Sequence, residues 1–179
     1  MDENRLERAL LPSMLRLRPL RPQDEQPARA AHEAMRADEF PFLLDYVASE
    51  SWAFYLQRRE ANRRGEQLPL RWVPSTFLAA TVQGILVGRI SIRHELNDWL
   101  SRYGGHIGYA VIPSMRGRGF GTEILRQGLV VARAIGVEDV LVTCDEDNIA
   151  SARLIEACGG VFESVVEGDE KPKRRYWFR

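Results

Sequence analysis

The sequence predicts an α/β fold in which helices cover both faces of one mixed sheet. Segments with strand character alternate with amphipathic helical segments, in the order strand, two helices, three strands, helix, strand, helix and two strands. The 179 residues, 45% of them hydrophobic and 28% charged, are also enough to enclose one core beneath a charged surface. We therefore expect a single domain over residues 1–179.

Each element in the first half has its own sequence signal. Apolar and basic residues alternate in the first strand, which follows a charged N-terminal arm. Pro22 suits the first turn of the first helix, and apolar residues at three- and four-residue spacing predict the second helix, which Gly65 ends. The dipeptide Gln83-Gly84 between two β-rich runs is typical of a hairpin. The expected elements are a helical arm within 1–12, strands over 13–20, 76–82 and 85–92, and a long helix over 43–64.

The second half of the chain repeats strand and helix with clear stop signals. Pro113 ends one strand and Gly136 ends a helix, while a short, wholly apolar run before Asp145 is typical of a strand covered on both faces. The expected elements are strands over 106–112, 140–144, 161–167 and 176–178, and helices over 122–135 and 150–157.

A glycine-rich loop joins the strand that ends at Pro113 to the helix that follows. Gly117, Gly119 and Gly121 lie directly before this helix, with Arg116 and Arg118 beside them. The first main-chain N–H groups of a helix have no partner within it and attract anions, and glycine lets a phosphate approach them closely. Arginine adds charge and forked donors. The loop therefore predicts a phosphate site, with an ordinary strand-to-helix turn as the alternative.

Three phosphate motifs compete for this loop. The dinucleotide pattern GxGxxG fails because Thr122 stands where its last glycine belongs, and a Walker loop needs a lysine that this segment lacks. The pattern Arg-x-x-Gly-x-Gly is met by Arg116, Gly119 and Gly121. In this respect the segment resembles the acetyl-CoA loop of the GNAT superfamily of acyl-CoA-dependent N-acyltransferases. Residues 148–160 are similar to a downstream helix motif of the same family, and residues 94–97 and 104–109 are similar to a subgroup of predicted acetyltransferases.

The resemblance implies a single mixed, mostly antiparallel sheet of six to seven strands with splayed central strands. It implies that an acetyl group moves from acetyl-CoA, without a metal, to a primary amine of a small molecule or peptide by direct attack. A main-chain N–H at Ala110 or Val111 is implied as the donor to the oxyanion. Asn148 is either a helix N-cap alone or also a contact to the pantetheine arm, and Ser151 is either a second such contact or a plain first-turn residue. The expected cofactor-binding residues are Ala110, Val111, Arg116, Gly117, Arg118, Gly119, Phe120, Gly121, Thr122, Asn148 and Ser151.

Such a reaction needs a base for the amine and an acid for the leaving thiolate. A primary amine with a pKa of about 10 is almost entirely protonated at neutral pH, so deprotonation must be assisted. His106 and Glu95, at the ends of neighbouring strands, are the candidates, with a purely structural histidine as the alternative. Ile155 replaces the family's usual tyrosine acid. Either Tyr109 or Tyr103 substitutes for it, the thiolate leaves unassisted, or acyl transfer has been lost.

The acceptor pocket is expected where the loop between the first two helices meets the strand loops. Aromatic rings with a few acidic groups suit an amine with an apolar body, and the same rings also suit core packing or a dimer contact. The acidic run 145–147 follows a strand, where ligands gather in open sheets, or is simply a solvated loop. The expected lining is Glu39, the exposed aromatics Phe40 and Phe42, Trp72 and residues 97–103.

Composition narrows the range of partners. Lys and Arg together number 25, as do Asp and Glu, and acidic residues interrupt the arginine runs, which disfavours nucleic acid. The sequence shows no secretory leader and no apolar stretch long enough for a membrane, and its two cysteines lack zinc-site spacing, so we expect a cytoplasmic protein with reduced thiols. A homodimer is compatible with the sequence. The alternative functions are a non-catalytic acyl-CoA sensor and an arginine-rich nucleic-acid binder.

Overall fold

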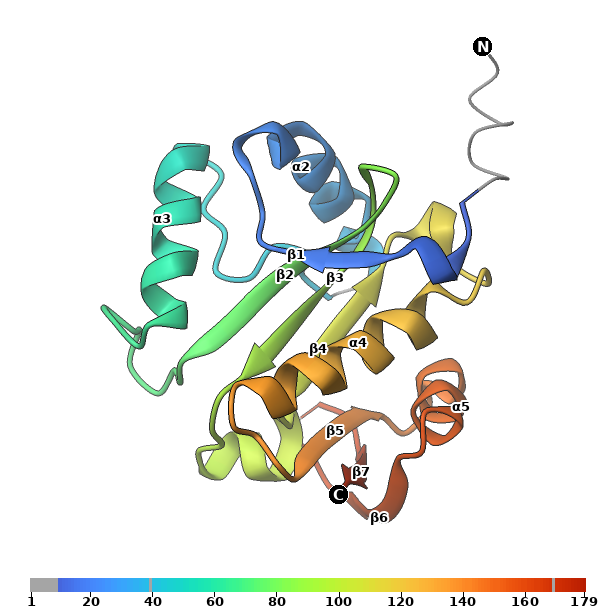
Figure 1. Cartoon of the computed structure of the whole chain (residues 1–179). Coiled ribbons are helices and arrows are strands. Elements are labelled where there is room, and N and C mark those ends of the chain that lie inside the picture. Colours follow the sequence, from blue (N-terminus) through green and yellow to red (C-terminus); the bar gives the residue numbers. More distant parts are fainter. Residues whose placement is uncertain (1–9, 39, 169) are drawn as a thin grey trace.

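The computed structural model describes residues 10–38, 40–168 and 170–179 (Figure 1). Within them one mixed sheet has the strand order β1-β2-β3-β4-β5-β7-β6, and its parallel pair is β4 with β5. This confirms the predicted fold class of a mixed, mostly antiparallel sheet. Most of the predicted N-terminal arm lies outside the described residues. The strands are β1 (Arg16–Arg18), β2 (Ser75–Val82), β3 (Ile85–Arg93), β4 (Ile107–Val111), β5 (Val140–Asp145), β6 (Val161–Val166) and β7 (Lys173–Phe178).

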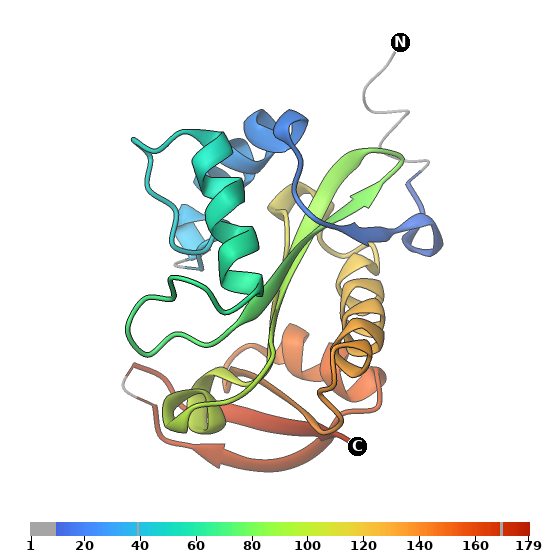
Figure 2. The same cartoon turned by 60° about the vertical axis from the view of Figure 1, so that its left-hand side comes forward.

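Helices cover both faces of this sheet, as predicted (Figure 2). One face carries α2 (Glu25–Ala34) and α3 (Trp52–Arg63), and the other carries α4 (Phe120–Ala134) and α5 (Ile149–Ala157). Each face has its own buried apolar cluster. None of the helices in the described part of the chain is long and apolar enough to span a lipid bilayer. The short helical turns are η1 (Pro12–Met14), η2 (Pro22–Asp24), η3 (Arg36–Asp38), η4 (Leu100–Gly104) and η5 (Pro113–Met115).

The second helix begins later than the apolar spacing predicts. Ser51 caps α3, because its side chain accepts a hydrogen bond from the Phe54 N–H at 3.3 Å. The preceding residues form turns, and Asp45 among them has a φ of +52°, which a helix does not allow. Phe42 is completely buried whereas Phe40 is 41% exposed, so the prediction of two exposed aromatics is wrong for Phe42.

The predicted hairpin and first strand differ in how closely the structure follows them. β2 and β3 join at Gln83 and Gly84, whose φ values of +51° and +85° are those of a primed hairpin turn, as predicted. The first strand is shorter than predicted, because residues 12–14 form η1 and leave only Arg16–Arg18 to pair with β2.

Two glycines let α4 lie close to the sheet. A Cβ at Gly128 would lie 2.1 Å from Cδ1 of Ile90 on β3, and a Cβ at Gly88 would lie 2.8 Å from Cδ1 of Ile124 on α4. Side chains at either position would force the helix away from the strand, because the interior has no free volume to accept them. The N-terminus of α4 is thereby held close to the end of β4.

Candidate active site

The two central strands separate after their first contact. The register of β4 with β5 in the described residues contains the single pair Ile107–Val142, and just before it the His106 N–H donates to the Leu141 carbonyl at 2.7 Å. Beyond that point β4 pairs only with β3, and β5 pairs only with β7. The facing edges therefore diverge toward the carboxyl ends of both strands and leave a gap. This confirms the predicted splay.

The register decides which N–H groups of β4 face the gap. The Ile112 N–H donates to the Val87 carbonyl, on the β3 side, at 3.0 Å. Because main-chain directions alternate along a strand, Ala110 also faces β3, whereas Tyr109 and Val111 face the gap. The Val111 carbonyl agrees with this direction, since it accepts a hydrogen bond from Nε of Arg116 at 3.2 Å. Of the two N–H groups predicted as oxyanion donors, Val111 is thus directed to the gap and Ala110 is not.

The glycine-rich loop lies at the open end of the gap and leads into α4. Gly119 is the N-cap of α4 with a φ of +81°, and Gly117 has a φ of +72°, both in the left-handed region that favours glycine. A glycine cap provides no side chain for the first N–H groups of the helix, which are those of residues 120–122. These groups and the positive end of the helix dipole suit an anion.

Neighbouring elements leave little room for side chains at Gly119 and Gly121. A Cβ at Gly119 would lie 3.3 Å from Cγ of Pro12 in η1, and a Cβ at Gly121 would lie 2.6 Å from Cδ1 of Leu154 in α5. Packing against η1 and α5 therefore favours glycine on both sides of the helix start.

Both arginines of the loop are held by neighbouring groups. Arg116 forms an ion pair with Asp38, the last residue of η3. The Arg118 guanidinium lies 5.4 Å from the centre of the Phe120 ring and donates to Sδ of Met115 at 3.4 Å. Phe120 is itself buried, so only its main chain is available to a ligand. A phosphate that binds Arg116 must compete with Asp38.

A hydroxyl pair connects β4 to α5. Tyr109 extends from β4, and its Oη lies 2.8 Å from Oγ of Ser151 on α5. Burial raises the pKa of Tyr109 to about 12 and that of the Cys144 thiol on β5 to about 11, and a hydrogen bond with Ser151 opposes both shifts. Both groups are therefore protonated at neutral pH, and Tyr109 is able to donate a proton.

The predicted downstream motif forms the start of α5. Oδ1 of Asn148 accepts a hydrogen bond from the Ser151 N–H at 3.0 Å, so Asn148 is an N-cap, as one of its two interpretations has it. Its side chain is exposed. Ile155 is completely buried in the core beneath the sheet. That position is part of the packing and carries no proton donor.

His106 has a different environment from that of a catalytic base. Its Nδ1 accepts a hydrogen bond from the Leu141 N–H at 3.0 Å, and a neutral imidazole that accepts at Nδ1 carries its hydrogen on Nε2. No lone pair then remains to take a proton from an amine. Burial, helped by the charge of Arg93, lowers the pKa of His106 to about 4. The contacts of His106 join the starts of β4 and β5, at the closed end of the gap.

Glu95 lies apart from the open end of the gap, whereas the acidic run lies at the carboxyl end of β5. Glu95 is exposed and follows the end of β3. In the acidic run, Asp145 forms an ion pair with Lys173, and Asp147 forms one with Lys171 at 3.0 Å. These are the two lysines of the chain, so the run is already neutralised in part and is a weaker candidate for a cationic acceptor.

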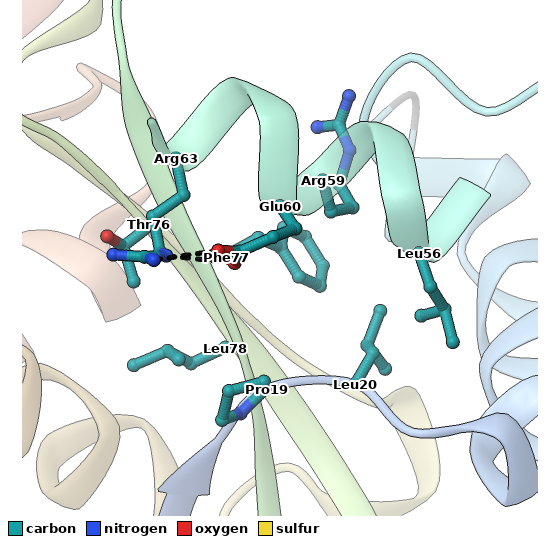
Figure 3. A pocket seen from close by; sticks show the side chains of 9 residues that line it. All are labelled: Pro19, Leu20, Leu56, Arg59, Glu60, Arg63, Thr76, Phe77 and Leu78. Atoms are coloured by element: carbon teal, nitrogen blue, oxygen red, sulfur yellow. Dashed lines mark hydrogen bonds and ion pairs between the residues drawn. The ribbon is translucent and has the colours of Figure 1, made fainter. Parts of the chain in front are cut away.

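A small cavity of about 90 Å³ lies between α3 and β2 (Figure 3). The ion pair between Glu60 and Arg63 borders it. None of the loop, β4, β5 and α5 residues of the candidate site lines this cavity, so it is separate from that site. Among the described residues, no three His, Cys, Asp or Glu side chains are grouped as metal ligands. The cavity is lined by Pro19, Leu20, Leu56, Arg59, Glu60, Arg63, Thr76, Phe77 and Leu78.

Comparison with known families agrees with this geometry. The family model described as "Acetyltransferase (GNAT) domain" matches residues 14–161. The chain belongs to the GNAT acetyltransferase family. It is 31% identical over 159 residues to a mycothiol acetyltransferase of Thermobispora bispora, a match that covers 83% of this chain and 47% of that protein. The chain thus spans about half the length of this curated relative.

Solved GNAT structures share the fold at low sequence identity. RimJ of Mycobacterium smegmatis, in complex with CoA-disulfide, has a TM-score of 0.68 and 18% identity, and the match covers 92% of this chain and 81% of that one. YncA of Salmonella typhimurium, with its cofactor acetyl-CoA, has a TM-score of 0.62 and 18% identity, and the match covers 93% of this chain and 94% of that one. GNAT proteins are acyltransferases, so the family places this chain in that enzyme class.

Two residues close to the candidate site, Asp38 and Arg89, were not among the predicted site residues. Asp38 binds Arg116 across the fold, and no local pattern marks such a contact. Arg89 lies completely buried in the middle of β3. Its signal was readable in the sequence, because a single arginine interrupts the apolar and small residues of the run 85–92.

Proposed function

We propose that the chain transfers the acetyl group of acetyl-CoA to a primary amine by direct attack. The observation that carries this proposal is the gap between β4 and β5, which opens onto the uncapped, glycine-bounded N-terminus of α4. A strand edge with unused main-chain groups suits the amides of a pantetheine arm, and a bare helix start suits a diphosphate. The strand edge and the helix start lie next to each other, as the pantetheine arm and the diphosphate do in CoA.

The predicted cofactor-binding residues would each contact a different part of acetyl-CoA. The N–H groups of residues 117–122 would bind the diphosphate, with Arg116 and Arg118 supplying charge. The edge of β4 would pair with pantetheine through Tyr109 and Val111, and the exposed amide of Asn148 would reach the arm from α5. Ala110 contributes through its position in β4, since its own N–H faces the other way.

The thioester carbonyl would be polarised by an N–H of β4 that faces the gap. As the amine nitrogen attacks, the carbonyl oxygen gains negative charge, which a preorganised N–H at Val111 or Tyr109 stabilises. The C–S bond then breaks, the nitrogen loses one proton and the sulfur gains one. The Tyr109 hydroxyl, held by Ser151 and protonated at neutral pH, is the proposed donor to the sulfur.

The amine must bind in its neutral form, because the contacts of His106 and the position of Glu95 suit neither of them to act as its base. For a primary amine this costs about 4 kcal/mol at neutral pH. The value of kcat/KM should therefore rise about tenfold per pH unit below the pKa of the amine. A flat profile would show that the protein supplies a base.

A second candidate function is a non-catalytic acyl-CoA sensor, which the buried Ile155 favours because the usual donor is missing there. The discriminating experiment offers acetyl-CoA and a panel of small amines, amino acids and peptides with free N-termini to the purified chain. Free thiol and acetyl-CoA binding are measured in parallel. Thiol release above hydrolysis with any amine supports the transferase. Calorimetric binding without release for the whole panel supports the sensor.

A further inference from the structure

Arg89 on β3 is a buried cation without a carboxylate partner in the described residues. Its Nη1 donates to the Gly108 carbonyl at 2.9 Å and its Nη2 to the Pro41 carbonyl at 2.8 Å, while its Nε has no hydrogen-bond partner. Burial lowers its pKa to about 9, which leaves the guanidinium charged at neutral pH. A buried charge bonded only to neutral groups is costly, and breaking its pairing is costlier still.

A second arginine increases this cost. Arg93 follows Arg89 on the same face of β3, and its Nη1 donates to the carbonyls of Gly104 and Gly105, each at 3.0 Å. Between them Ser91 is almost completely buried. The charge of Arg93 contributes to lowering the pKa of Arg89, so the two guanidinium groups repel each other. Neither forms an ion pair within the described part of the chain. The charges of Arg89 and Arg93 are therefore not balanced by an anionic side chain of the described residues.

In this cationic stripe, which we define as Arg89, Ser91 and Arg93, Arg89 lies beside the part of β4 that borders the gap. Arg89 is in register with Ala110 on β4, and Nη1 lies 3.7 Å from where a Cβ of Gly108 would be. The stripe is on the face that α2 and α3 cover, opposite to the α4 and α5 face that holds the Tyr109 hydroxyl. An acceptor that approaches the thioester across β4 from this face would contact Arg89 once the segment that covers it has moved.

The cover over Arg89 is a short loop segment. The Phe40 ring lies 4.7 Å from Cζ of Arg89 and is 41% exposed, and the Pro41 carbonyl accepts from Nη2. That carbonyl is a neutral acceptor, so a carboxylate that replaces it would form a stronger, charge-assisted bond. With Nε unpartnered beside Nη2, Arg89 has two adjacent donors for the two oxygens of one carboxylate.

We propose that the acceptor is a small molecule that carries a carboxylate as well as the reacting amine, such as an amino acid with an apolar side chain, and that Arg89 binds this carboxylate in place of the Pro41 carbonyl. The inference rests on the proposed transfer to an amine. It also connects to the chemistry, because two nearby guanidinium groups disfavour an ammonium ion and so favour the neutral amine that attacks.

The kinetic test compares matched acceptors. Leucine, phenylalanine and methionine are each paired with their carboxamide, and kcat/KM is measured from thiol release with saturating acetyl-CoA. It is expressed per concentration of neutral amine, because the amine of a carboxamide has a lower pKa than that of the acid. The acids should exceed the amides by about tenfold to hundredfold, and Arg89→Gln should bring this ratio close to one, with Arg89→Lys in between. A ratio measured on one preparation does not depend on how much of the variant folds. Arg133→Gln, at an exposed position of α4, is the matched control and should keep the wild-type ratio.

A second test measures ligand binding and does not require turnover. N-acetyl-leucine and N-acetyl-leucinamide are titrated with CoA present, so no amine and no catalysis are needed. Tighter binding of the acid that Arg89→Gln abolishes supports the carboxylate site, even if no amine releases thiol and the transferase itself fails. Equal binding of acid and amide by the wild type, or an acid preference that survives in Arg89→Gln, overturns the inference.

Discussion

The glycine that caps α4 provides a direct test of the anion site. Gly119 has a φ of +81°, where an alanine costs about 1–2 kcal/mol of unfolding free energy, and its Cβ would lie 3.3 Å from Cγ of Pro12. To relieve both, the loop must turn the N–H groups of residues 120–122 away from the site. Each charge-assisted hydrogen bond to a phosphate that is lost costs about 1.5–3 kcal/mol. Gly119→Ala should therefore weaken acetyl-CoA binding about tenfold to hundredfold.

Gly136 supplies the matched control for this substitution. It follows the other end of α4 with a φ of +95°, and a Cβ there would meet nothing within 4 Å. Gly136→Ala should cost a similar unfolding free energy and leave the affinity unchanged. Isothermal titration calorimetry measures the Kd, and chemical denaturation measures stability. If both variants lose similar stability and both keep the wild-type Kd, the diphosphate does not bind at this loop.

Three further outcomes follow from the contacts of the site. Tyr109→Phe should lower kcat about a hundredfold with little change in acetyl-CoA Kd, and the wild-type rate should not decline up to pH 9, because the pKa of Tyr109 is about 12. Asp38→Asn should tighten acetyl-CoA binding about threefold, since it releases Arg116 from a partly exposed ion pair. The unfolding free energy should fall as pH drops from about 6.5 to about 4, because the unfolded chain protonates His106 before the folded chain does.

Each of these outcomes has a result that contradicts it. An unchanged kcat in Tyr109→Phe would mean that the thiolate leaves unassisted. Weaker binding in Asp38→Asn would mean that Asp38 orients Arg116 toward the ligand. His106→Gln keeps an acceptor for the Leu141 N–H, so it should flatten the acid-dependent loss of stability with a smaller effect on kcat than Tyr109→Phe. If His106→Gln lowered kcat more than Tyr109→Phe does, His106 would be the base.

Local sequence signals predicted the parts of the fold that depend on neighbours in the chain. The Gln83-Gly84 turn and the glycines before α4 need specific backbone angles, and those needs are visible in the residues themselves. The buried Phe42 and the contact between His106 and Leu141 depend on segments that the topology brings together, so no local pattern marks them. Arg89 combines both situations. Its strand was predictable from the sequence, whereas the absence of an anionic partner for its guanidinium in the described residues was visible only in three dimensions.

The single register pair between β4 and β5 also affects which lengths of acyl chain a protein with this fold could accommodate. Strands β1 to β4 and strands β5 to β7 form two hydrogen-bonded units that meet at one end, near Ile107 and Val142. A slight rotation about this end would widen the opposite end without breaking a hydrogen bond in either unit. Donors with longer acyl chains could then be accommodated by substitutions along the inner edges and in the apolar cluster that spans both units, while the cluster under α2 and α3 stays unchanged.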